Sequence, residues 1–188
     1  MRLRKRTTEI IIHCSDTQEG VNVTAADIRR WHTTPREKGG RGWDDIGYHY
    51  VISIYGELQF GRDPRYQGAH CAAPLDRRKP NGPSHNQVAL GICYIGGRHI
   101  TEDGGWQWDD TRTEAQKRMM LVLVTAELLR YGLTTDAVHG HNEFSAKACP
   151  CFDVRKWVRE ELEPYIEREA ERSRNPRLWA LLPGKNVT

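Results

Sequence analysis

The sequence HGHNEFSAKACPCFD at residues 139–153 holds an imidazole, a lysine and a cysteine within nine positions, at His141, Lys147 and Cys149. An earlier histidine, His13, ends the β-rich segment EIIIH near the N-terminus. Two histidines and one cysteine supply three protein ligands for zinc, and a catalytic zinc ion keeps its fourth position open for water. The pattern therefore favours a zinc hydrolase in which the strand ending at His13 lies beside residues 139–153.

Spacing alone leaves the second ligand and the roles of two other side chains open. His139 competes with His141, because one residue separates them and both point to the same face of an extended segment. Lys147 is either a solvated surface lysine or a cation that stabilises a developing oxyanion. Tyr48, at the entry to a predicted strand, is either a half-buried strand residue or a phenol that hydrogen-bonds the reacting water.

Composition favours one domain in a reducing compartment. The chain has 188 residues, and 28 basic against 25 acidic side chains give a net charge of +3, which does not favour nucleic acid as the main partner. Four of the first six residues are Arg or Lys, but no apolar run follows, so we expect neither a signal peptide nor a membrane segment. Five cysteines, an odd number, argue against a disulfide framework. Three of them have apolar neighbours and should pack as small hydrophobic residues: Cys14, Cys71 and Cys93.

The hydrophobic pattern predicts an α/β fold with a single mixed β-sheet flanked by helices. Apolar and β-branched runs predict its strands, at residues 9–13, 48–54, 57–62 and 88–95. The second and third runs flank Tyr55-Gly56 and should form a hairpin, whereas residues 138–141 are either a short strand or a loop. Residues 63–86 are rich in Pro, Gly, Asn and Asp and should form a long loop, and loops of that length are usually functional.

Capping residues predict three helices, which begin at Thr24, at a capping box formed by Thr113 and Gln116, and at Asp153. Gly132 is well placed to end the second helix, which is apolar around much of its surface and should be buried. Pro164 should bend or end the third. The expected organisation is a solvated basic tail, a catalytic domain and a peripheral C-terminal tail, at residues 1–7, 8–166 and 167–188.

Several blocks, in their order along the chain, resemble the zinc-dependent N-acetylmuramoyl-L-alanine amidase family. That family includes phage amidases, bacterial amidases of muropeptide recycling and the peptidoglycan recognition proteins. The resemblance covers about residues 8–160 and is greatest to single-domain phage amidases. The blocks are IIIHCSDT, the pair Trp31-His32, GWDDIGYHYVI, GELQFGRD, GAHC, SHNQVALGICYIGG and HGHNEFSAKACPCFD.

The resemblance implies a function for each block. It implies that His13, His141 and Cys149 bind Zn²⁺, which favours His141 over His139. It implies that Tyr48 orients or deprotonates the attacking water and that Lys147 stabilises the tetrahedral oxyanion. The bond cut would be the amide between N-acetylmuramic acid and L-alanine of the peptidoglycan stem peptide.

The substrate groove is implied less directly. His70 of GAHC and Asn86 of the HN pair match positions that line the family's groove, and loop 63–86 would form part of it. The chain departs from many relatives at Cys151, where they carry a small hydroxyl residue. Two nearby thiols, Cys149 and Cys151, predict sensitivity to oxidation.

The biological role has alternatives. A compact amidase without a signal peptide suits a phage or prophage endolysin, which is made in the cytoplasm and reaches the cell wall when a holin opens the membrane. A cytoplasmic muropeptide-recycling amidase is the main alternative, although in those relatives a glutamate takes the role of Tyr48. A non-catalytic peptidoglycan-binding protein is a further alternative, but such relatives usually lack the cysteine ligand. Some phage amidases also inhibit a phage RNA polymerase, a partner for which the basic N-terminus is weak support. A zinc deaminase is rejected, because that class needs a distant P-C-x-x-C motif.

Overall fold

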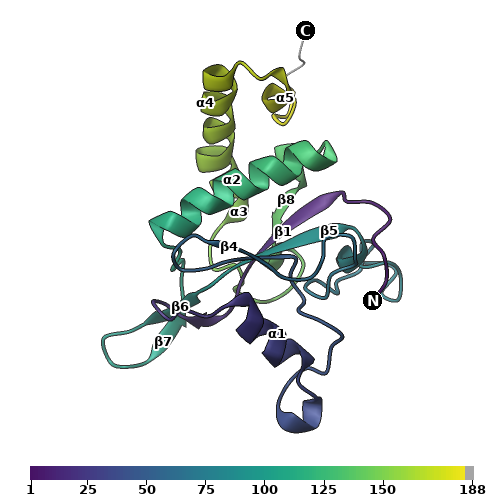
Figure 1. Cartoon of the computed structure of the whole chain (residues 1–188), viewed down its shortest axis with the longest axis vertical. Coiled ribbons are helices and arrows are strands. Elements are labelled where there is room, and N and C mark those ends of the chain that lie inside the picture. Colours follow the sequence, from purple (N-terminus) through teal and green to yellow (C-terminus); the bar gives the residue numbers. More distant parts are fainter. Residues whose placement is uncertain (185–188) are drawn as a thin grey trace.

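The computed structural model describes residues 1–184, and a five-stranded mixed sheet forms its centre (Figure 1). The strand order is β4-β3-β5-β1-β8, in which only β4 is antiparallel to its neighbour. The strands are β1 (Glu9–Cys14), β3 (Tyr50–Ile52), β4 (Leu58–Phe60), β5 (Ala89–Tyr94) and β8 (Val138–Gly140). The α/β class, the mixed sheet and the β3–β4 hairpin predicted from the sequence are therefore confirmed.

A second, smaller sheet lies beside the first and was not predicted. It contains β2 (Thr17–Gln18), β6 (Gly97–Ile100) and β7 (Trp106–Trp108), in the order β2-β6-β7. Its strands are short and largely exposed, so the alternation of buried and exposed side chains that reveals a strand is missing. The sequence predicted a single sheet, whereas the structure contains this second sheet as well.

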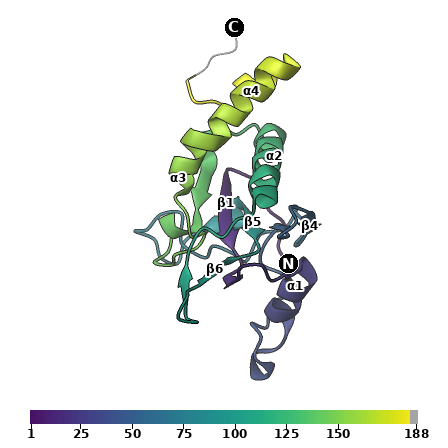
Figure 2. The same ribbon diagram turned by 90° about the vertical axis from the view of Figure 1, so that its left-hand side faces the viewer.

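Helices cover both faces of the main sheet (Figures 1 and 2). Alternate residues of β3 belong to different layers: Tyr50 and Ile52 pack in the cluster that contains the buried side of α2, and Val51 packs in the cluster that contains α1. The helices are α1 (Ala25–Thr33) and α2 (Glu114–Tyr131), with the expected capping box at the start of α2 and Gly132 ending it at φ 64°. Short 3₁₀ turns complete the layers, at Arg36–Lys38, His85–Gln87, Thr135–Ala137 and His141–Glu143.

The C-terminal helical segment differs from the expected boundary at residue 167. Its parts are α3 (Val154–Trp157), a π turn (Val158–Leu162), α4 (Glu163–Ser173) and α5 (Pro176–Trp179). Pro164 does not end the helix: Glu163 N–H bonds Val158 O across a widened turn just before the proline, which has no N–H of its own. Apolar side chains beyond residue 166 are buried in the main core: Ala170, Leu178, Leu181 and Leu182. These residues thus belong to the domain rather than to a peripheral tail, and residues 185–188 lie outside the described part.

The basic N-terminus is also attached to the domain. Arg4 Nη1 donates to Ala89 O at 3.0 Å, and Arg4 Nη2 donates to Pro64 O. Leu3 forms an isolated bridge with Tyr66. The N-terminal segment is thus bonded to the domain at Leu3 and Arg4, while most of its side chains are exposed, and its assignment as a tail stays a prediction. Within residues 1–184, no helix combines the length and the apolar character needed to cross a membrane.

The long loop between β4 and β5 lies next to the segment that follows β8. Before the turn at His85–Gln87 the loop forms two isolated bridges, Tyr66 with Leu3 and Pro74 with Ser84. Arg77 Nη2 donates to Glu143 O at 3.0 Å, which fixes the loop against the 3₁₀ turn after β8. The predicted long loop is confirmed, and it borders the site described next.

Candidate active site

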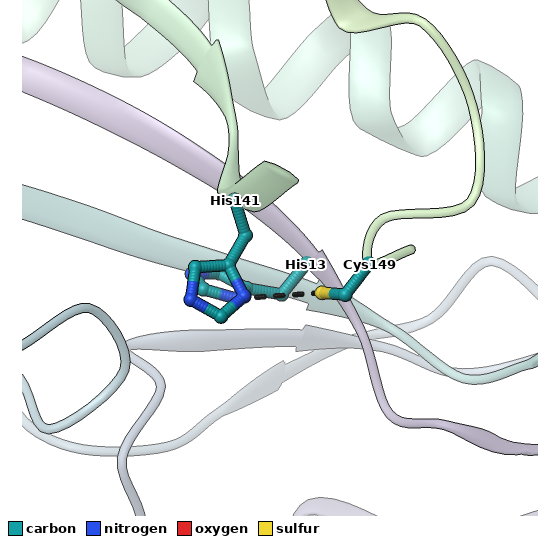
Figure 3. Close-up of side chains that lie close together, drawn as sticks. All are labelled: His13, His141 and Cys149. Atoms are coloured by element: carbon teal, nitrogen blue, oxygen red, sulfur yellow. Dashed lines mark hydrogen bonds between the residues drawn. The ribbon is translucent and has the colours of Figure 1, made fainter. Parts of the chain in front are cut away.

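His13, His141 and Cys149 meet at the carboxyl ends of two parallel strands. Ile12 of β1 pairs with Gly140 of β8, so the residues that follow each of them lie side by side. The ring centroids of His13 and His141 are 4.5 Å apart, and Cys149 Sγ is 3.7 Å from His13 Nδ1. One ligand atom from each of the three lies within 4.8 Å of the others. Figure 3 shows the three side chains converging from β1, the 3₁₀ turn after β8 and the loop before α3.

The chemistry of this cluster fits a zinc ion. Nδ1 of His141 is buried and makes no hydrogen bond within residues 1–184, which is costly unless something binds it. Burial, assisted by the Lys147 charge, lowers the pKa of His141 to about 4, and burial lowers the pKa of His13 well below its usual range. Both imidazoles are therefore neutral at pH 7, the state in which they bind a metal. Two nitrogens and one sulfur are a donor set typical of zinc.

His139 is excluded from the cluster by its own hydrogen bonds. Its Nδ1 lies 3.2 Å from Glu143 Oε2, and Arg155 also contacts that nitrogen. Glu143 accepts further hydrogen bonds from Gly140 N–H and from Arg155 Nε. Because β8 ends at Gly140, His139 and His141 no longer share a face. His139 instead contacts Glu143 and Arg155, which lie on either side of the loop before α3.

Tyr48 and Lys147 line the same cavity as His141 and Cys149, a space of about 480 Å³. The Tyr48 ring centroid lies 5.2 Å from that of His13. Burial raises the pKa of Tyr48 well above its usual range, so its phenol is neutral and donates a hydrogen bond more readily than it removes a proton. Lys147 is exposed on the cavity wall, where its ammonium group can meet a substrate oxygen.

His70 lies beside His13, lines the same cavity and is almost fully buried. Its Nδ1 is 3.0 Å from His13 Nε2, and its Nε2 is 3.4 Å from Ala89 O. If His13 binds a metal through Nδ1, its Nε2–H donates to His70, whose own Nε2–H donates to Ala89. A Cβ at Gly91 would lie 2.6 Å from His70 Cδ2, so only glycine leaves room for this ring. Substrate binding by His70 stays a prediction, and orientation of His13 is the role its contacts favour.

Asn86 holds the backbone that carries His70. Its Oδ1 accepts from the backbone N–H groups of His70 and Cys71, both at 2.8 Å. The side chain is not among those that line the cavity. Its predicted contact with substrate stays a prediction, whereas its hydrogen bonds show that it positions the His70 segment.

Comparison with known proteins agrees with this geometry. The family described as N-acetylmuramoyl-L-alanine amidase matches residues 4–152. The endolysin of Escherichia phage T7 is 33% identical over 154 residues, which cover 82% of this chain and 87% of that one. This chain belongs to the N-acetylmuramoyl-L-alanine amidase family. The endolysin of Enterobacteria phage T3 is 32% identical over the same shares of the two chains.

Solved structures show the same fold. The N-acetylmuramoyl-L-alanine amidase LysC from Clostridium intestinale has a TM-score of 0.56 at 23% identity, over 89% of this chain and 85% of that one. Drosophila PGRP-LB has a TM-score of 0.61 at 21% identity, over 86% and 85% of the two chains. At these identities the likeness concerns the fold, and it supports the amidase fold expected from the sequence.

Replacement of His70 in the amidase is expected to weaken zinc binding. His70→Ala removes the acceptor that holds His13 Nε2–H, and loss of such a partner typically costs about 10–100-fold in metal affinity. Competition with a chromogenic chelator at pH 7 would measure the change. His99→Ala, which alters a half-exposed histidine paired with Glu19, is the matched control. Equal zinc affinity in the His70 and His99 variants would exclude an orienting role for His70.

Three thiols of the amidase lie together at the site. Cys14 N–H donates to Cys149 Sγ at 3.3 Å, and Cys14 Sγ lies 3.5 Å from Cys151 Sγ. All the cysteines are free thiols, and Cys71 and Cys93 are buried as expected. Cys14 is buried too, but its contacts make it more than a packing residue. Hydrogen bonds from Cys149 and Cys151 lower the pKa of the Cys14 thiol below its usual value.

Oxidation of the amidase is expected to join Cys151 to Cys14, whose sulfur atoms are 3.5 Å apart. Hydrogen peroxide would be reduced to water while the two thiols lose their hydrogens and form one disulfide. The bond would move the Cys14 N–H that supports Cys149 Sγ and so lower zinc affinity. Peptide mapping identifies the linked pair, and Cys151→Ser is expected to protect zinc content. A disulfide that contains Cys149 would contradict this prediction.

Proposed function

We propose that this amidase is a zinc enzyme that cuts the amide between N-acetylmuramic acid and L-alanine of peptidoglycan, as a phage or prophage endolysin. The observation that carries the proposal is the convergence of His13, His141 and Cys149 on the cavity lined by Tyr48 and Lys147. Zinc-assisted amide hydrolysis needs ligands for the metal, a cation for the developing oxyanion and a hydrogen-bond donor for the water. The three ligands, Lys147 and Tyr48 supply these groups.

Each residue has a distinct task in this reaction. His13, His141 and Cys149 would hold the zinc ion, which when bound supplies Lewis-acid polarisation of the scissile carbonyl and activation of water. The neutral Tyr48 phenol orients the attacking water by donating a hydrogen bond. Lys147 places a positive charge where the carbonyl oxygen becomes negative, so it stabilises the transition state more than the ground state. Half-buried Cys149 and buried His13 keep the ligands away from bulk water.

Two observations favour the lytic role over muropeptide recycling. By the family resemblance, Tyr48 takes the role that a glutamate has in the recycling relatives, and the phage relatives named above are endolysins. An endolysin would be made in the cytoplasm and reach the wall after a holin opens the membrane. A purely binding protein is disfavoured because the three ligands and Lys147 are all present. Contact with a phage RNA polymerase stays a prediction, since no feature of residues 1–184 adds to the sequence argument for it.

Mass spectrometry of products from purified Gram-negative peptidoglycan tests the proposal. We expect free stem peptides that begin with L-alanine, intact glycan strands, and loss of product when a zinc chelator is present. Addition of zinc after the chelator should restore the products. Cleavage of soluble muropeptides without cleavage of intact wall would instead support the recycling role. Binding to the wall without any product would support the binding-protein role.

A further inference from the structure

One face of the hairpin formed by β6 and β7 carries an exposed aromatic pair. The strand register pairs Arg98 with Trp108 and Ile100 with Trp106, so these four side chains share a face. Trp108 is 56% exposed, Trp106 47% and Ile100 38%. We call these four residues the hairpin platform. Exposed aromatic side chains gathered on one face of a soluble protein mark a surface that binds something.

The platform is held rigid by a network that leaves its rings accessible. Trp108 Nε1 donates to Asp16 Oδ1 at 3.1 Å, and Arg98 donates to both carboxylate oxygens of Asp16, at 2.8 and 2.9 Å. Arg98 also lies 4.4 Å from the Trp106 ring centroid, and the two indole rings meet edge to face at 5.2 Å. The indoles are thus fixed before any ligand arrives, which reduces the entropy lost on binding.

The platform continues the active-site cavity. Trp108 and Asp16 line that cavity together with Lys147 and Cys149. Trp106 lies two residues back along the same strand face, so the aromatic surface leads outward from the reacting groups. Figure 1 shows the hairpin projecting from the body of the domain beside the main sheet. A long substrate that enters the cavity would therefore pass over the platform.

We propose that the hairpin platform binds the glycan strand of peptidoglycan, on sugars next to the muramoyl unit whose amide is cut. This inference rests on the proposed function. It assigns a binding surface to the glycan, the part of the substrate that lies away from the zinc ligands. Sugar rings have an apolar C–H face that stacks on indole, while their hydroxyl and acetamido groups need hydrogen-bonding partners at the edge. Asp16 and Arg98 provide an acceptor and a donor at that edge.

The charge of the platform argues for a sugar polymer over a lipid surface. Its cation, Arg98, is already paired with Asp16, so no uncompensated positive charge attracts anionic headgroups. Insertion into a bilayer would also strip water from that ion pair, which is costly. Glycan, which is uncharged along its ring faces, meets neither obstacle.

Binding to peptide-free glycan strands tests the proposal independently of catalysis. Full-length protein with one equivalent of zinc is titrated with strands from which all stem peptides have been removed. Trp108→Ala and Trp106→Ala are each expected to weaken binding about tenfold or more. Trp108→Phe, which keeps an aromatic ring, should stay within about threefold of the parent. Gln107→Ala, on the opposite face of β7, is the matched control and should bind like the parent.

The outcomes separate this inference from the proposed function. Loss of strand binding in both tryptophan variants, with an unchanged melting temperature, supports the platform even if no stem peptide is ever released. Equal binding by the parent and both variants, or no binding by the parent, overturns it even if the parent cleaves intact wall. Binding of the parent to phosphatidylglycerol vesicles, lost in the same variants, would also overturn it and assign the platform to lipid. If the parent cleaves intact wall, Trp106→Ala and Trp108→Ala should each raise KM for that substrate and keep kcat within about twofold of the parent.

Discussion

Cys149→Ser should remove bound zinc from the amidase and lower the rate of stem-peptide release by at least about a thousandfold. The thiolate is the anionic member of the proposed ligand set, and a serine hydroxyl stays protonated at pH 7 and binds zinc weakly. The two remaining imidazoles, His13 and His141, offer too few ligands to hold the ion at ordinary concentrations. Metal analysis after gel filtration, with the product assay on the same sample, measures both losses.

The thermal stability of the same variant provides a second readout. A ligand that binds only the folded state stabilises it by mass action, by about 4 kcal/mol when free zinc is a thousand times its Kd. Added zinc should therefore raise the Tm of the parent and leave that of Cys149→Ser unchanged. Cys151→Ser, which removes the neighbouring thiol, is the matched control and should keep zinc, activity and the Tm shift. Full activity and one bound zinc in Cys149→Ser would refute the ligand set.

The sequence predicted the main sheet and the candidate ligands because both depend on local patterns. Apolar runs and caps such as Thr113 with Gln116 act within a few residues, and the structure shows the expected capping box. His13 and His141 follow parallel strands, and the carboxyl ends of neighbouring parallel strands lie at one edge of a sheet. The choice between His139 and His141 needed the resemblance, since spacing did not reveal that β8 ends at Gly140.

The features that the sequence missed depend on contacts between distant residues. Cys14 and Cys151 are 137 positions apart, and their 3.5 Å contact arises only when β1 meets the loop after Cys149. The hydrogen bonds of Asn86 to the His70 segment are of the same kind. Of the two outcomes predicted for Pro164, a bend or an end of its helix, the second is wrong, because packing of Ala170 and the residues beyond it maintains the helix past the proline. Local rules therefore find most elements and the caps of α2, whereas tertiary packing decides features such as the helix that continues past Pro164.

Lys147→Ala should lower kcat for stem-peptide release by about 100- to 1,000-fold and leave zinc binding intact. The lysine side chain is exposed on the cavity wall, so its loss should not unfold the domain. A group that stabilises charge developing in the transition state typically contributes rate of this size. Because the ground-state substrate is neutral at the scissile carbonyl, KM should change much less than kcat.

The zinc affinity of this variant decides between a catalytic and a structural role. The Lys147 charge helps to lower the pKa values of His13 and His141, so it opposes a cation at the same place. Removal of this charge should leave zinc affinity unchanged or increase it, while kcat falls. If Lys147 were merely structural, zinc affinity and kcat would either both fall or both stay unchanged. Lys156→Ala, at an exposed lysine of α3 beside Glu160, is the matched control and should behave like the parent. An unchanged kcat in zinc-loaded Lys147→Ala would show that another group stabilises the oxyanion.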